Sequence, residues 1–476
     1  MPNSKMYTSR NQSTFTIVRT LPSKFWLLNI LQMLEKLAYW SVLLQMSVYI
    51  AQKDVAGGLA WEQSLKGIIF FIWAMLQNLT PFFLGGIPDK FGRKRILLLS
   101  LFLIILSYIV LATQTAFVPF LAGILLLGFA SGLFKPALQG ALAATLNGKN
   151  TSIAWGIYFM LLNLALIAAP PLSKYLKELS WAAVFWGSAL IILINYFIAF
   201  FWKTDNISVK NVDLFSPVRT AMKSFARPQV YMFILSMSGF AIIYMQFYET
   251  FQNFIIDWSN TSSIAKSLPQ FMTSETQRGI MISYEWLYFI NSILITFFIV
   301  YISKLTGKIP KIKAIILGVL LSTAGIALAG TTISGSFLIF GFVVYTFGEM
   351  ITNPKFTDYL SSIAGANEKS MYLGYLNLSM AIGLGSGALL GGFLYGHFAE
   401  KSALAMRYLS EHGISIAGVN AGKALLYLSK QLHITEQQAT ELLWNSYHPW
   451  IMWMPFLAIS IFSVICLYLY SKKFKS

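Results

Sequence analysis

The sequence contains few charged residues. Asp, Glu, Lys and Arg make up 11% of its 476 residues, whereas hydrophobic residues make up 56%. A soluble globular domain carries about 25% charged residues, so this composition excludes one and predicts a membrane protein. The charged residues are also unbalanced, with a formal net charge of +17. In so apolar a chain this excess favours orientation in an anionic membrane over binding to nucleic acid, and we expect no nucleic-acid partner.

Cysteine and histidine are also scarce. The single cysteine, Cys466, excludes a disulfide framework and a cysteine-based metal site. Gaps of 15, 21 and 15 residues separate the four histidines, unlike any metal-ligand spacing, and all four lie in or beside one polar segment: His397, His412, His433 and His448. We therefore expect no metal and no cofactor. A proton relay within the membrane would have to use carboxylates.

Long apolar runs dominate the rest of the chain. A transmembrane helix needs about 20 predominantly apolar residues. Twelve such runs lie between polar breaks, at 25–51, 63–87, 96–113, 117–146, 152–173, 180–202, 229–256, 284–303, 312–331, 335–363, 370–397 and 449–471. The predicted parts are a cytoplasmic tail at 1–24, a six-helix bundle at 25–202, a cytoplasmic linker at 203–228, a second six-helix bundle at 229–471 and a tail at 472–476.

Basic residues orient this map. With the N-terminus in the cytoplasm, most Lys and Arg fall in cytoplasmic loops, as the positive-inside rule requires. Lys66 belongs to the minority that we assign to the external side, whereas Lys36, Lys135 and Lys355 fall within predicted spans.

The two halves contain similar short motifs. Leu162, Asn163 and Leu164 in the fifth span recur as Leu-Asn-Leu at 376–378 in the eleventh, and a Lys-Pro step in the fourth span faces a Pro-Lys step in the tenth. Two parallel six-helix repeats are typical of transporters that expose a central site alternately to the two sides of the membrane.

A tight basic turn connects the second and third spans. It reads GGIPDKFGRKR from residue 85 to residue 95. Gly85 and Gly92 permit close approach of the helices, and Asp89 and Arg93 can pair with each other and with a helix terminus. The turn resembles the signature loop of the major facilitator superfamily. The alternative is an ordinary positive-inside loop, which gives no reason for an aspartate in so basic a run.

Within that superfamily, the chain resembles the proton-dependent oligopeptide transporters. The similar segments are 128–136 with its Lys-Pro, 158–165 with its aromatic pair and Asn, 289–294 with its Asn, and 348–354 with Gly-Glu and a Pro. The first span differs from the family's Glu-x-x-Glu-Arg pattern, because Gln32 and Lys36 flank Glu35; a lysine keeps the charge of arginine but loses its bidentate fork. The resemblance implies proton-coupled peptide transport, with substrate-binding roles for Tyr39, Lys135, Asn163, Asn291 and Glu349.

Six ionisable residues fall at membrane depth. Each costs about 2.5–3.5 kcal/mol even on the lenient insertion scale, so it should face a cavity or a partner. We predict that Glu35, Lys36 and Lys135 couple protons. Glu35 is expected to pair with Lys135, because Lys36 points about 100° away around the helix. Protonation of Glu35 would then break the pair and switch the protein between two states. The alternative is a static buried ion pair that fixes helix register.

Two further carboxylates, Glu249 and Glu349, lie near the middle of the seventh and tenth spans. We predict that both line the cavity and can hold a substrate ammonium or a proton, although a glutamate bonded only to its neighbours is the alternative. Lys355 and Asp358, three residues apart, are interpreted as a pair at the membrane interface and not as part of the site.

Residues 398–448 form a predicted external insertion between the last two spans. This segment is too polar to insert and too regular for disorder, and its pattern predicts amphipathic helices at 401–412, 420–433 and 436–447, the last with a capping box opened by Thr435 and Gln438. A lid or a docking platform for another protein fits this pattern. We expect the segment to be separable from the twelve-span core.

These features predict an all-α membrane protein with the major facilitator fold: twelve transmembrane helices in two six-helix halves, with both termini cytoplasmic. We expect a monomeric, proton-coupled secondary active transporter of small peptides or peptide-like solutes in a bacterial inner membrane or a plasma membrane. The alternatives are a major facilitator transporter of another organic solute, or a non-transporting receptor or assembly platform that acts through 398–448. An enzyme is not expected, because the spans contain no histidine and no clustered nucleophile and base.

Overall fold

The structure is a computed structural model that describes residue 19 and residues 21–146, 151–202, 216–364 and 369–474. Twelve helices within these residues are long and apolar enough to cross a membrane, as predicted. The N-terminal half contains α2 (Ser23–Ala51), α3 (Gln63–Leu84), α5 (Arg93–Thr113), α6 (Phe117–Thr145), α7 (Thr151–Leu179) and α8 (Trp181–Phe201). The C-terminal half contains α10 (Pro228–Tyr248), α13 (Tyr284–Leu305), α14 (Lys311–Gly330), α15 (Gly335–Ile363), α16 (Lys369–Phe398) and α20 (Met454–Phe474). Most of the expected N-terminal tail, the first half of the linker and the last two residues lie outside the described residues.

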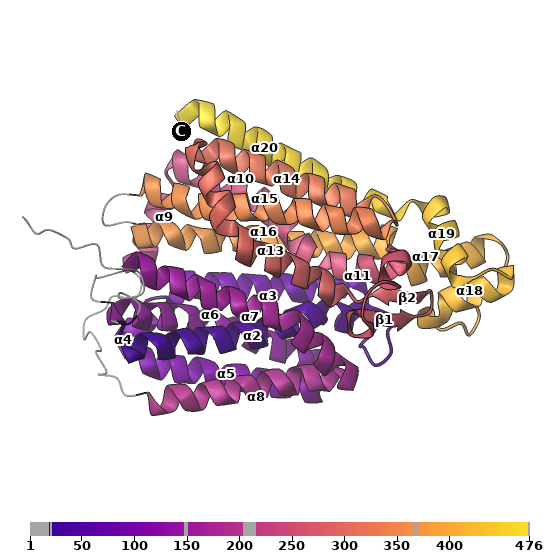
Figure 1. Cartoon of the computed structure of the whole chain (residues 1–476), viewed down its shortest axis with the longest axis horizontal. Coiled ribbons are helices and arrows are strands. Elements are labelled where there is room, and N and C mark those ends of the chain that lie inside the picture. The colour runs from indigo at the N-terminus through magenta and orange to yellow at the C-terminus, as the bar shows by residue number, and fades with distance from the viewer. Residues whose placement is uncertain (1–18, 20, 147–150, 203–215, 365–368, 475–476) are drawn as a thin grey trace, which may run out of the picture.

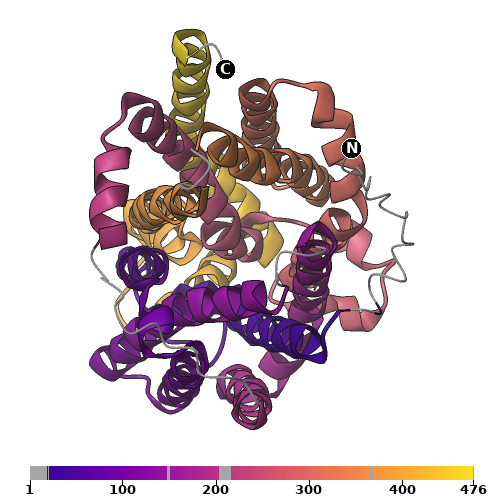
Figure 2. The same ribbon diagram turned by 90° about the vertical axis from the view of Figure 1, so that its left-hand side faces the viewer.

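The two halves lie side by side along the full length of the bundle (Figures 1 and 2). Figure 1 shows the N-terminal half in indigo to magenta below the C-terminal half in pink through orange to yellow. A group of short helices and a hairpin projects beyond one end of the bundle, where residues 399–448 lie. We call this the outer end, because the distribution of Lys and Arg predicts that it lies outside, and we call the opposite end the inner end.

The seventh span is broken where the sequence predicts a continuous helix. Helix α10 ends at Tyr248, and α11 (Thr250–Trp258) begins after Glu249, whose φ of −121° and ψ of −57° depart from helical values. Irregular backbone within a membrane is found where it is buried in protein or lines a cavity. The break therefore marks Glu249 as a position with a special environment.

An outer loop after α11 contains the strands of the described residues. It runs through α12 (Ser262–Ala265) and a 3-10 turn to the antiparallel hairpin of β1 (Thr273–Thr276) and β2 (Gly279–Ile282). Arg278 at the hairpin turn donates to the backbone oxygens of Ser259, at 3.2 Å, and Ile256. The hairpin is thus tied to the outer end of α11.

The external segment folds as α17 (Lys401–Glu411), α18 (Ala424–Leu432) and α19 (Glu436–Tyr447), with the capping box of Thr435 and Gln438 formed. Its buried side chains belong to the same hydrophobic core as the outer part of the C-terminal half, a core that contains Leu404, Leu428, Leu443, Trp258 and Trp453. The expectation of a separable segment is therefore corrected, because its apolar faces are buried against the spans and not only against each other.

Shorter elements complete the described chain. They are α4 (Ile87–Phe91), α9 (Ser216–Phe225) and the 3-10 turns Gln270–Met272, Thr306–Lys308, Ala421–Lys423 and Pro449–Trp453.

Candidate functional site between the two halves

A polar cluster lies on the N-terminal side of the interface between the halves. Glu35 of α2 is buried and its Oε2 lies 2.9 Å from Lys36 Nζ. Lys36 Nζ also lies 4.8 Å from the ring centre of Tyr39, and Tyr39 in turn hydrogen-bonds Gln77 of α3 at 3.0 Å. The structure thus pairs Glu35 with Lys36 and not with Lys135 as expected, because a flexible lysine side chain can bend back towards the preceding residue.

Lys135 contacts the opposite half. It lies on α6, is exposed, and its Nζ donates to Asn377 Oδ1 of α16 at 3.1 Å. This hydrogen bond connects the two halves midway along α6. The expected contact between Lys135 and Glu35 is therefore replaced in this state, although the two remain within electrostatic range. Asn377 belongs to the Leu-Asn-Leu repeat; its counterpart Asn163 lies half-buried on α7.

A second polar cluster surrounds Glu349 on the C-terminal side. Asn291 of α13 donates to Glu349 Oε2 at 3.2 Å and to Thr346 Oγ1 at 2.9 Å. Tyr248 and Asn353 approach Glu349 Oε1 at 3.5 Å each. Within the described residues these partners are all neutral, and no Lys or Arg forms an ion pair with Glu349. Glu349 is thus a buried carboxylate that lacks a cation.

A small hollow lies next to this carboxylate and between the halves. Spans of both halves line it, with Trp40, Leu44, Leu166 and Pro170 on one side and Tyr248, Tyr288, Asn291 and Ser292 on the other. Two of the residues that hydrogen-bond Glu349 therefore also face the hollow. Its volume of about 10 Å³ has room for roughly one water molecule, so a larger solute would need side chains to move apart.

Glu249 is placed differently from its prediction. It does not face the hollow: its Oε1 lies 2.6 Å from Lys66 Nζ, and both side chains are fully buried. Lys66 also donates to Asn253 Oδ1 at 3.1 Å and to Ser47 Oγ at 3.3 Å. Lys66 therefore belongs to α3 inside the protein and not to an external loop, which corrects the earlier assignment.

Further contacts join the halves towards the outer end. Lys177 at the end of α7 lies 3.2 Å from Glu285 Oε1 of α13, and Gln45 donates to the same oxygen at 3.0 Å. Helices α3 and α16 also pack with their backbones in contact, since a Cβ added at Gly67 would lie 2.6 Å from the backbone oxygen of Ala388. Small residues permit such close approach. These contacts close the structure between the hollow and the outer end. We call the ion pairs among them the outer closure, which consists of Lys66 with Glu249 and Lys177 with Glu285.

The predicted signature turn is a compact structural element at the inner end. Asp89 Oδ1 accepts from Arg93 Nε at 2.8 Å and Nη2 at 2.7 Å. Gly92 has a φ of +97°, which favours glycine, and Gly85 lies so close to the preceding turn of α3 that a Cβ would approach the Pro81 oxygen.

Lys355 is half-buried, and Asp358 pairs with Lys311 of α14 at 2.9 Å and not with Lys355 as expected.

Several functional positions were not found from the sequence. Lys66 and Glu285 lie at the ends of apolar runs, where a charge is easily assigned to a loop. Gln45 and Asn253 are uncharged, and single amides within apolar runs carry no specific signal. The predicted second span, 63–87, already contained Lys66, so its assignment to the external side disagreed with that boundary.

Comparison with known proteins supports the fold and the family. The sequence profile of the Major Facilitator Superfamily matches residues 28–388. The chain is 21% identical over 406 residues to the Na(+), Li(+), K(+)/H(+) antiporter of Planococcus maritimus, covering 75% of this chain and 91% of that protein. It is 29% identical over 182 residues to the tetracycline resistance protein, class B, of Escherichia coli, which covers 37% of this chain and 42% of that protein.

Solved structures share the same fold. The nucleoside transporter NupG matches with a TM-score of 0.67 at 14% identity, covering 96% of this chain and 100% of that one. A POT family transporter in complex with 5-aminolevulinic acid matches with a TM-score of 0.64 at 15% identity, covering 90% and 97%. The matching family and these neighbours are transporters and not enzymes, in agreement with the expectation that the chain is not an enzyme. With its twelve candidate spans and a profile match over most of its length, the chain belongs to the major facilitator superfamily of membrane transporters.

Proposed function

We propose that the protein is a proton-coupled secondary active transporter of small peptides or peptide-like solutes that carry a free amine. It would work by alternating access, as a monomer in the cell membrane. The observation that carries this proposal is the environment of Glu349, a buried carboxylate whose described partners are neutral and which lies beside a hollow shared by both halves. A substrate ammonium would supply the missing positive charge.

The ligand class follows from the chemistry of the cluster. Hydrogen bonds to charged groups contribute about 1.5–3 kcal/mol each, so an ammonium on Glu349 would contribute substantially to binding. The tyrosines and the asparagine at the hollow offer donors and acceptors for a peptide bond or a similar polar group. On the opposite side, Lys135 and Lys36 present positive charge suited to a carboxylate. Amine on one side and carboxylate on the other is the charge pattern of a short peptide or an amino acid.

The proton has two sets of candidate carriers. Glu35 is buried beside Lys36 and within electrostatic range of Lys135, so we keep these three residues as the proposed coupling group. We reassign Glu249 from the proposed substrate site to the outer closure. A proton on its carboxylate would remove the attraction to Lys66 that joins the halves. Proton entry along the membrane potential contributes about 2.3 kcal/mol per 100 mV, which is sufficient to drive accumulation.

The second candidate is exchange of protons for another cation or organic solute. It is favoured by the relatives at sequence level, whose names refer to cation exchange and drug resistance. Membership of a transporter family argues against a receptor or assembly platform that does not transport.

Uptake into proteoliposomes tests the proposal. A panel of di- and tripeptides, their amino-blocked analogues and a drug-like cation would be offered with and without an inward proton gradient. We expect gradient-driven uptake of free-amine peptides, with Glu349→Gln reducing it and Glu275→Gln, a change at an exposed hairpin carboxylate, leaving it unchanged. Gradient-driven movement of the drug-like cation alone would replace the proposal with the second candidate.

A further inference from the structure

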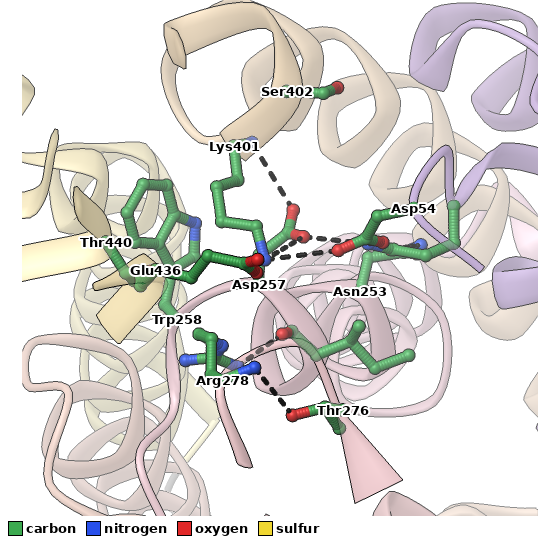
Figure 3. A network of polar contacts seen from close by, with 12 residues as sticks. Asp54, Asn253, Asp257, Trp258, Thr276, Arg278, Lys401, Ser402, Glu436 and Thr440 are labelled. Atoms are coloured by element: carbon green, nitrogen blue, oxygen red, sulfur yellow. Dashed lines mark hydrogen bonds and ion pairs between the residues drawn. The ribbon is translucent and has the colours of Figure 1, made fainter. Parts of the chain in front are cut away.

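The external segment meets both halves of the transporter at one charged cluster. Figure 3 shows Lys401, the first residue of α17, between the carboxylates of Asp54 and Asp257. Its Nζ lies 3.2 Å from Asp54 Oδ2 and 3.6 Å from Asp257 Oδ1, and its side chain is 4% exposed. Asp54 belongs to the loop between α2 and α3 of the N-terminal half, whereas Asp257 lies in the last turn of α11 of the C-terminal half. One buried ammonium thus bridges the two halves.

Contacts of the external segment with the C-terminal half are extensive and mainly apolar. Trp258 Nε1 donates to the backbone oxygen of Ala399 at 2.8 Å. The rings of Trp258 and Trp444 lie 5.7 Å apart, and those of Phe254 and Trp444 lie 6.1 Å apart. Since the segment also continues α16 directly and shares its hydrophobic core, it should move with the C-terminal half as one body.

Contacts with the N-terminal half are carried mainly by charged and polar groups. Besides the bond from Lys401 to Asp54, Lys53 Nζ lies 2.7 Å from Glu400 Oε1. Gln52 donates to Asp54 at 2.6 Å and to Asp257 at 2.7 Å. Gly422 lies against the backbone oxygen of Lys53, so closely that a Cβ at this position would clash. Groups of this kind can hydrate when separated, which makes this side of the contact suited to repeated opening.

We propose that residues 399–448 form a latch that belongs to the C-terminal half and holds the N-terminal half through Asp54 and Lys53 when the outer end is closed. Opening of the outer end must separate Lys401 from Asp54 and Glu400 from Lys53. The latch therefore sets how often the outward-open state forms. It goes beyond the proposed function, because it concerns the balance between two states for any solute, although it rests on movement of the halves.

The position of the latch explains why it can control the outer end. The latch lies further out than the Lys66–Glu249 and Lys177–Glu285 pairs, and all three sets of contacts join the same two halves, so they should open together. Coupling between sites in proteins commonly amounts to a factor of about 5–150 in an equilibrium. Loss of the latch should shift the population towards the outward-open state by a factor in that range.

Labelling of a single cysteine from outside tests the latch without a substrate. The reporter is Leu44→Cys in a Cys466→Ser background, because Leu44 lines the hollow on the inner side of the closure and is 3% exposed. A membrane-impermeant maleimide applied to intact cells should reach it only when the outer end opens. Lys401→Ala should raise the labelling rate at least about five-fold, and Lys401→Arg should restore a rate near that of the parent.

A matched control and a second variant complete the design. Arg407→Gln lies on the same helix and breaks an exposed pair with Glu411 that does not join the halves, so its labelling rate should remain that of the parent. If Lys401→Ala fails to fold, Gly422→Ala pushes the segment from Lys53 without a change of charge and should also accelerate labelling. Parent rates in folded, monodisperse Lys401→Ala and Gly422→Ala proteins would overturn the latch, whatever uptake assays show about the solute.

Discussion

Removal of the buried lysine of the outer closure provides a direct measure of how the halves are held together. In Lys66→Met, the side chain keeps roughly its length and loses its charge. Glu249 then remains fully buried with one carboxylate oxygen bonded to Thr250 at 2.6 Å, while its Oε1, which lies 2.6 Å from Lys66 Nζ, has lost its partner. Breaking a buried pair by removal of one member destabilises by about 3–5 kcal/mol, because an uncompensated charge remains.

The neutral double variant separates the pair from its surroundings. Glu249→Gln in the Lys66→Met background removes the unpaired charge, so most of the lost free energy of unfolding should return. We expect a coupling free energy between the two positions of about 1–3 kcal/mol. The measurement is unfolding in mixed detergent and sodium dodecyl sulfate, followed by tryptophan fluorescence, for the parent, both single variants and the double variant.

A surface pair serves as the control for this cycle. Lys311 and Asp358 lie 2.9 Å apart, but their side chains are 36% and 53% exposed. Exposed pairs contribute about 0–1 kcal/mol, so Lys311→Met should change the free energy of unfolding little. If Lys66→Met loses no more stability than Lys311→Met, the buried pair does not hold the halves together and the outer closure has another origin.

Three further predictions follow from individual residues. Lys135→Ala should abolish gradient-driven uptake while the protein stays folded and inserted, and wild-type driven uptake in the purified variant would exclude Lys135 from coupling. Glu349→Gln should weaken binding of free-amine substrates by about 1.5–3 kcal/mol more than binding of amino-blocked analogues; equal losses in competition assays would assign Glu349 a structural role. Burial raises the pKa of Asp257 from 3.8 to about 6, so the closed outer end binds a proton more tightly than an open one in which this carboxyl is hydrated. The stabilisation of the closed state by the proton on Asp257 is then fully present below about pH 4 and is lost as the pH rises through about 6. Pulsed electron paramagnetic resonance distances between labels at Thr115→Cys and Lys430→Cys should show more open protein at about pH 7 than at about pH 5, and this difference should vanish in Asp257→Asn.

The charged surroundings of Asp257 explain why its protonation does not release the latch. The charged and titratable groups that act on it are Lys401, Asp54, Tyr395 and Arg278. The pKa of Asp54 is lowered, because Lys401 and its hydrogen bond from Gln52 outweigh the burial that acts to raise it. Asp54 therefore stays charged while Asp257 gains a proton. The bond from Lys401 to the N-terminal half survives in the pH range in which the second carboxylate is neutralised.

The sequence specified the spans because their physical signal is strong. Apolar runs of about 20 residues and the bias of Lys and Arg follow from the thickness and charge of the membrane, and both are readable without any contact information. The capping box at Thr435 was also predictable, since it depends on residues only three positions apart. The hairpin at 273–282 was not, because strands of four residues carry little periodicity.

The site was only partly predictable, since pairing depends on the packing of distant spans. Glu35, Lys135 and Glu349 stood out because an ionisable group at membrane depth is costly. Their contacts were not predicted: Asn291 was named through the family resemblance but not as a partner of Glu349, and the uncharged Asn377 was not expected to bind Lys135. Each asparagine lies on a different span from the residue that it contacts. Helical direction alone also excluded the bond between Glu35 and Lys36, since it specifies where a side chain starts and not where a long one ends.

The division of partners between the halves distinguishes the closure from the substrate site. Each ion pair of the outer closure and of the latch has one member from each half: Lys66 with Glu249, Lys177 with Glu285, and Asp54 with Lys401. These pairs exist only while the outer end is closed, and because a buried pair gains little over two hydrated ions, the closed and open states can differ by little free energy. Glu349 contrasts with them, because Asn291, Thr346 and the other residues around it all belong to the C-terminal half. Its environment can therefore persist in both states, which is what a group that keeps hold of a solute during the change of access requires.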